Sequence, residues 1–113
     1  KISRNIARFH QKYDIWLTPT LGQPPVGLGH FVFSEGGDPI EMRRRMAEFS
    51  PFTFITNSSG QPSASIPLYW NDQGLPIGIH MAARFGDEAT IFRLSSQLEE
   101  ARPWKDKRPP VSV

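Results

Sequence analysis

The sequence predicts an α/β segment in which helices cover a mixed β-sheet. Three observations support this fold class. Segments with helical periodicity alternate with β-rich segments in the order α-β-α-β-β-α. Residues 63–83 hold two β-rich runs joined by a short Asn/Asp/Gly turn, which is typical of a hairpin. A final apolar stripe at helical spacing ends at Pro103. We therefore expect residues 1–113 to form a single segment.

The first predicted element is a helix that has no cap of its own. Ile2, Ile6, Phe9 and Tyr13 recur at the spacing of one helical face. A helix without a start signal indicates a segment cut from a longer protein. Residues 14–19 then form a short apolar run closed by proline, and we expect a buried strand there.

A long loop and a capped helix are expected next. Residues 19–38 hold five glycines and a Gln-Pro-Pro sequence, which is typical of a surface loop. Asp38 can cap the following helix, Pro39 suits its first turn and Glu41 can complete a capping box. We expect this helix to end at about Phe49.

The hairpin is the strongest architectural signal. We expect strands over residues 63–70 and 75–83, with Pro67 and Pro76 confined to edges or bulges because proline cannot donate to a ladder. In the second strand, large and small apolar residues alternate, which favours burial of both faces. Asp87 can cap the last helix.

The composition excludes several kinds of site. The chain has no cysteine, so it has no disulfide, no thiolate zinc site and no cysteine nucleophile. Its histidines, His10, His30 and His80, are far apart in sequence, and we expect neither a metal site nor a cofactor. No apolar run is long enough to span a membrane and no signal peptide is visible, so we expect a cytoplasmic protein.

The charge is distributed unevenly along the chain. Residues 1–12 carry +4, residues 101–113 carry +3, and the residues between them carry −5. A nucleic-acid binder would place basic and aromatic residues together on one face. We expect solvated charge on a terminal helix and a tail, and no nucleic-acid partner.

One serine cluster has the form of a nucleophile loop. Ser58-Ser59-Gly60 follows an apolar stretch, and a lysine, or His80 with Asp14, could in principle activate a serine there. The lysines, however, lie on polar faces or in the tail, where nothing favours a neutral amine. We favour a turn for Asn57-Ser58-Ser59-Gly60 and a hydrogen-bonded structural role for His80. Nearby Phe49, Phe52 and Phe54 fit ordinary core better than a substrate pocket, although both interpretations stay open.

Five segments carry a resemblance to a known family. Their order and spacing, between Tyr13 and Pro109, resemble the C-terminal part of the amidase signature family of serine amidohydrolases. The branch resembled includes bacterial amidases and hydrolases of the cyclic nylon-oligomer type. The five segments are Tyr13–Thr20, Asn57–Pro67, Gly74–His80, Phe85–Glu88 and Leu98–Trp104.

The resemblance implies a C-terminal portion of the amidase signature fold and the hydrolysis of a carboxamide C–N bond through an acyl-serine. The family's nucleophile, its second serine in a cis peptide and its lysine lie in the N-terminal part, so no catalytic residue is expected in this chain. Ser58-Ser59-Gly60 aligns with a later turn. A helix before Asn57 lines the acyl side of the pocket in relatives, which makes Ser50 and Phe54 candidate substrate-binding residues.

The implied partners are the missing N-terminal part of the same enzyme and a small amide substrate. We also expect the enzyme to form a homo-oligomer. The alternative is a non-enzymatic truncated paralogue or an assembly module. A third hypothesis, that Gln23-Pro24-Pro25 is a ligand for an aromatic groove, has no repeat to support it.

Overall fold

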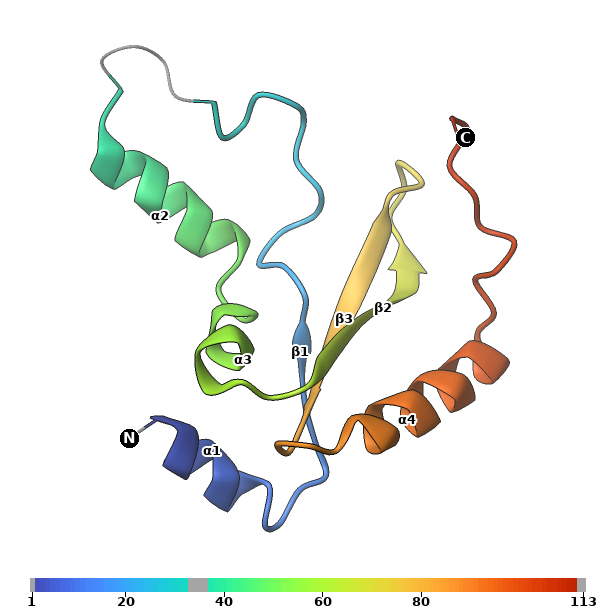
Figure 1. The fold of residues 1–113 in the computed structure, drawn as a ribbon. Helices are drawn as coiled ribbons and strands as arrows, with labels where there is room; N and C mark the ends of the chain where they lie inside the picture. Colours follow the sequence, from blue (N-terminus) through green and yellow to red (C-terminus); the bar gives the residue numbers. More distant parts are fainter. Residues whose placement is uncertain (1, 33–36, 112–113) are drawn as a thin grey trace.

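A three-stranded sheet with helices around it forms the centre of the molecule (Figure 1). The computed structural model describes residues 2–32 and 37–111. Lys1, with which the predicted first helix begins, and part of the predicted 19–38 loop lie outside these ranges. The elements are α1 (Ile2–Phe9), β1 (Ile15–Pro19), α2 (Pro39–Phe49), α3 (Phe54–Ser59), β2 (Ser63–Trp70), β3 (Pro76–Ala83) and α4 (Glu88–Ala101).

The strand order is β1-β3-β2, which places the last strand of the sequence in the middle. Both pairings are antiparallel, with Thr18 opposite His80 in one and Ile66 opposite Ile79 in the other. The mixed pairing expected from the sequence is therefore not seen among the described strands. The tight turn forces β2 and β3 to run in opposite directions. On the other edge of β3, β1 is also antiparallel to it, so β1 and β2 run in the same direction.

The predicted hairpin is confirmed, and its turn is held by a side chain. Asn71 Oδ1 accepts hydrogen bonds from the backbone N–H groups of Gln73 and Leu75, at 3.1 and 2.8 Å. Pro67 stands where the β2–β3 register shifts, and Pro76 is the first residue of β3. The two prolines thus occupy the irregular and terminal positions that their missing N–H requires.

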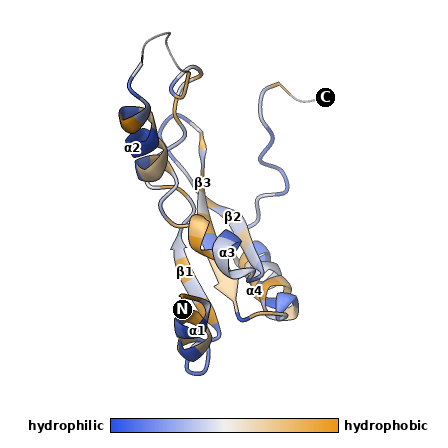
Figure 2. Ribbon diagram, turned by 60° about the vertical axis from the view of Figure 1, so that its left-hand side comes forward, coloured by the Kyte–Doolittle hydropathy of each residue, from blue (hydrophilic) through white to orange (hydrophobic). Residues whose placement is uncertain are grey.

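The core lies between the sheet and α4. Met81 and Ala83 of β3 have no exposed surface and pack with the buried Ile66 and Ile91. Figure 2 shows α4 beside the sheet, while α2 stands away from it in both views. Alternation along β3 sends its other side chains to the opposite face, near α3, where Ser63 Oγ lies 3.5 Å from Thr56 Oγ1. Half-buried side chains complete the core: Ile15, Ala64, Leu68, Leu94, Leu98 and Trp104.

Three local expectations need correction. The turn predicted at Asn57-Ser58-Ser59-Gly60 is instead the end of α3, and Gly60, with φ of 73°, closes that helix. Asp87 occupies the N-cap position of α4 as expected, but its side chain makes no capping hydrogen bond; its carboxylate accepts from the Arg84 and Thr90 side chains instead.

The third correction concerns the capping box of α2. Asp38 caps the helix as expected, accepting from Ile40 N at 2.9 Å. Glu41 does not complete the box, because it forms salt bridges with Arg44 and Arg45. Their hydrogen bonds lower the pKa of Glu41 to about 2.

The chain is more open than an independent domain of its length. Its radius of gyration is 16.7 Å, whereas a compact domain of this length has roughly 13 Å. Large apolar side chains stay exposed on most elements, among them Ile2, Tyr13, Leu17, Ile40, Met46, Phe54, Phe85 and Phe92. No helix in the described ranges is long and apolar enough to cross a membrane. Exposed apolar surface of this extent is typical of faces that contact other protein.

We expect the isolated 113-residue chain to self-associate. The outer edges of β1 and β2 are unpaired within the described sheet, and uncovered apolar surface adds to the drive for association. Light scattering across micromolar concentrations should report species larger than the monomer. A monodisperse monomer at all concentrations would contradict this expectation.

Candidate functional site

The two sequence-predicted substrate-binding residues flank the junction between α2 and α3. Ser50 caps the C-terminus of α2, where its backbone N–H donates to Met46 O at 2.9 Å. Its hydroxyl lies 2.8 Å from Thr53 Oγ1. Phe54 opens α3, and 68% of its surface is exposed. The structure thus brings both residues to one corner, with Ser50 held in place and Phe54 uncovered.

The loop after β1 ties this corner to the sheet. Thr20 N donates to Gly78 O at 3.0 Å, and Gly22 N donates to Phe49 O at 2.9 Å. A Cβ on Gly22 would overlap the Glu48 carbonyl oxygen, so only glycine lets the loop approach α2 this closely. The start of the loop is therefore fixed by two backbone hydrogen bonds, one to β3 and one to α2.

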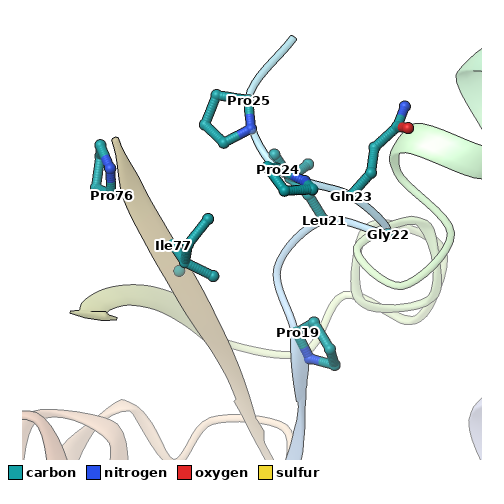
Figure 3. Close-up of a pocket in the computed structure, with 9 residues that line it drawn as sticks. Pro19, Leu21, Gly22, Gln23, Pro24, Pro25, Pro76 and Ile77 are labelled. Atoms are coloured by element: carbon teal, nitrogen blue, oxygen red, sulfur yellow. The ribbon is translucent and has the colours of Figure 1, made fainter. Parts of the chain in front are cut away.

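A cavity of about 260 Å³ lies between this loop and the start of β3 (Figure 3). Prolines and aliphatic groups form most of its wall, and none of the residues that line it is titratable. It can therefore hold an apolar group, but it has no residue for acid–base chemistry. Ser50 and Phe54 are not in its wall, which consists of Pro19, Leu21, Gly22, Gln23, Pro24, Pro25, Pro76, Ile77 and Gly78.

Polar side chains line the sheet face opposite α4. Thr18 Oγ1 lies 3.3 Å from Nδ1 of His80, and Thr20 Oγ1 lies 2.5 Å from Ser65 Oγ. A Cβ on Gly78 would come within 2.5 and 2.6 Å of Ser65 Oγ and Thr20 Oγ1, so Gly78 leaves room for that hydrogen bond. Burial lowers the pKa of His80, which favours the neutral ring. These contacts support the structural role expected for His80.

Local hydrogen bonds hold Ser59 of the serine cluster. Ser59 Oγ donates to Gln61 Oε1 at 2.9 Å and also lies 3.4 Å from Thr56 O. His80 Nδ1 lies within hydrogen-bond distance of Thr18 Oγ1, outside the serine cluster. No side-chain hydrogen bond joins Asn57 to another residue of the described ranges, whereas the Asn71 side chain holds the hairpin turn through two such bonds.

Sequence reasoning missed His10. It is buried beside Ile6, one helical turn earlier, and both line a second cavity at α1. The sequence does contain an indication of this burial, because His10 follows Ile6 by four residues and so shares its helical face. Among the described residues, no group of three or more His, Cys, Asp and Glu side chains could hold a metal ion.

The family model described as Amidase matches residues 1–92. The chain belongs to the amidase signature family. The protein AmiC of Mycobacterium leprae (strain TN), which its name places among the amidases, is 35% identical over 104 residues. The 6-aminohexanoate-cyclic-dimer hydrolase of Paenarthrobacter ureafaciens is 31% identical over 102 residues. These alignments cover 92% and 86% of this chain, but only 22% and 20% of the relatives.

Solved structures also match most of this chain with only part of their own length. The structure of 6-aminohexanoate cyclic dimer hydrolase matches 96% of this chain with a TM-score of 0.85 and 29% identity. A glutamyl-tRNA(Gln) amidotransferase polypeptide from Thermotoga maritima matches 93% with a TM-score of 0.65 and 26% identity. The chain covers 23% and 21% of those two proteins, so it corresponds to about a fifth of a family member.

We expect Gly22→Ala to destabilise the loop, while Gly27→Ala leaves it unchanged. The new methyl group at residue 22 meets a backbone oxygen, whereas nothing lies within 4 Å of a Cβ at residue 27. Such overpacking costs about 1–3 kcal/mol. Denaturant unfolding of the complete amidase should report this loss for Gly22→Ala alone. Equal stability of the two variants would show that the loop does not contact α2 this closely.

Proposed function

We propose that this chain is the C-terminal scaffold and pocket-lining part of an amidase. The complete enzyme would hydrolyse a carboxamide C–N bond through an acyl-serine intermediate. The observation that carries the proposal is the likeness of 96% of this chain to part of 6-aminohexanoate cyclic dimer hydrolase. Membership of the amidase signature family supports the reaction class. The five segments that resemble the C-terminal part of the family support the position in the chain.

The chemistry divides between this chain and the rest of the enzyme. A serine outside residues 1–113 would attack the amide carbonyl, and the amine would leave with a proton supplied by the enzyme. Water would then hydrolyse the acyl ester and release the acid. The nucleophile and its lysine would come from the rest of the enzyme. Lys12, Lys105 and Lys107 are exposed, whereas a lysine base sits in a site that excludes water.

This chain would contribute a wall of the acyl side of the pocket. Phe54 presents a large apolar ring at the start of α3, and Ser50 holds the preceding corner through Thr53. An exposed aromatic ring next to a fixed polar corner suits contact with the carbon chain of a small amide. The loop at Gly22 would keep α2 and its corner at a constant distance from the sheet.

We expect the 113-residue chain alone to give only background rates with a panel of short amides and esters. The complete enzyme should hydrolyse at least one of them. Ser58→Ala and Ser59→Ala in the complete enzyme should retain activity, since both serines belong to a short helix. Turnover by the isolated chain that either substitution abolished would overturn the division of chemistry. A complete protein without the family's serine nucleophile, second serine and lysine would favour the truncated paralogue.

We expect Phe54→Ala in the complete enzyme to lower kcat/KM by about 10- to 200-fold. Loss of apolar contact with a substrate is worth about 1–3 kcal/mol. The matched control is Phe92→Ala, which removes an equally exposed ring from α4. Initial-rate kinetics on the best amide of the panel provide the measurement. If both variants kept wild-type kcat/KM, Phe54 would have no place in the pocket.

A further inference from the structure

The cavity of about 260 Å³ between the loop after β1 and the start of β3 offers an entering group few polar partners. Four of its nine lining residues are prolines, which have no backbone N–H to donate. Figure 3 shows the Ile77 side chain pointing from β3 toward the loop, whereas the amide of Gln23 points away from the cavity. A polar group in this space would therefore lose its hydrogen bonds to water without replacing them.

Backbone groups of two further wall residues already have partners. Gly78 O accepts from Thr20 N at 3.0 Å, and Gly22 N donates to Phe49 O at 2.9 Å. The first of these bonds joins the two sides of the cavity, because Thr20 begins the loop and Gly78 belongs to β3. The proline rings restrict the loop further, since each fixes its own φ. The wall is thus held in one shape before a ligand arrives, which favours selection by length and shape.

The same loop connects the cavity with the corner that carries Ser50 and Phe54. Gly22 lies in the cavity wall, and it bonds to the carbonyl oxygen of Phe49, the residue before Ser50. Phe54 exposes its ring four residues later, at the start of α3. The cavity and the proposed acyl-side wall therefore belong to one hydrogen-bonded unit.

The volume of the cavity sets the size of the group that it can hold. An apolar cavity of roughly 150 Å³ takes up benzene. By the same measure, a space of about 260 Å³ has room for up to roughly ten carbon atoms. None of the lining residues is titratable, so a charged group would enter without a counter-ion.

We propose that this cavity binds the far end of an uncharged hydrocarbon chain on the acyl part of the substrate. The amide group itself stays outside the cavity, where the serine of the rest of the enzyme attacks it. The substrates are then neutral aliphatic amides of medium chain length, rather than very short amides or amides with a charged tail. This inference rests on the proposed function, because it requires a complete amidase.

A series of linear carboxamides from butanamide to decanamide tests the chain-length preference of the complete enzyme. We expect kcat/KM to rise about fourfold for each methylene group removed from water, and to level off once the cavity is filled. Leu21→Trp narrows the cavity from the loop side. It should lower kcat/KM for octanamide at least about tenfold and leave that for butanamide nearly unchanged. The matched control is Leu28→Trp, the same change in the same loop at a fully exposed side chain outside the wall.

Heptanamide with an ammonium group at its far end tests the exclusion of charge. This amide has the length of octanamide, but an ammonium group replaces the terminal methyl group. We expect its kcat/KM to be at least about tenfold lower than that of octanamide, because no carboxylate lines the cavity. Equal values for the two amides would overturn the proposal of an uncharged chain.

The competing occupant is a side chain from the rest of the enzyme. In that case Leu21→Trp lowers the Tm of the complete enzyme, yet the dependence of kcat/KM on chain length stays that of the wild type. That result would overturn the proposal, as would a wild type without chain-length preference or an equal effect of Leu28→Trp. If Leu21→Trp does not fold, Ile77→Ala removes contact from the opposite wall. It should lower kcat/KM for octanamide about tenfold and that for butanamide little, and equal losses for both amides would overturn the proposal.

Activity and binding separate this inference from the proposed function. An enzyme that hydrolyses amides without regard to chain length retains the proposed function and loses the inference. An enzyme that hydrolyses no amide loses the proposed function, and calorimetric titration with octanamide then decides the inference. The wild type should bind octanamide at least about tenfold more tightly than Leu21→Trp, and equal Kd values would overturn the proposal.

Discussion

The pairing of β3 on both of its edges is the constraint on which the rest of the structure depends. One face of this strand places Met81 and Ala83 against α4, where they have no exposed surface. Its other face holds His80 among hydroxyl groups. A one-residue slip of β2 would turn its own side chains over, so that Ser65 would face the apolar core and Ile66 the polar face. The register of β3 therefore orients α4 and the polar face at once.

Glycine sets the distances around the candidate site. Gly78 lets Thr20 and Ser65 meet across the central strand, and Gly22 lets the loop bond to the end of α2. Both act through the space that a missing Cβ leaves, since neither has a left-handed backbone in this structure. The corner that carries Ser50 and Phe54 is thus fixed to the sheet by backbone contacts rather than by a shared apolar core.

The open shape of the chain agrees with its membership of a family of much longer proteins. A three-stranded sheet with one well-packed helix buries few side chains completely, and many large apolar groups stay in solvent. His10 adds a polar counterpart, because its Nε2 is buried without a hydrogen-bond partner among the described residues. Apolar surface without cover and a buried polar atom without a partner are both costly.

The sequence by itself determined the hairpin, the cap at Asp38 and the stop at Pro103, because turn chemistry and caps depend on neighbouring residues. Its resemblance also identified the family. It did not predict α3, because six residues are too few for a periodic pattern and Asn57-Ser58-Ser59-Gly60 has the composition of a turn. Only the tertiary structure placed β1 beside β3 and enclosed His10, because both depend on contacts between residues distant in sequence, which leave no local pattern.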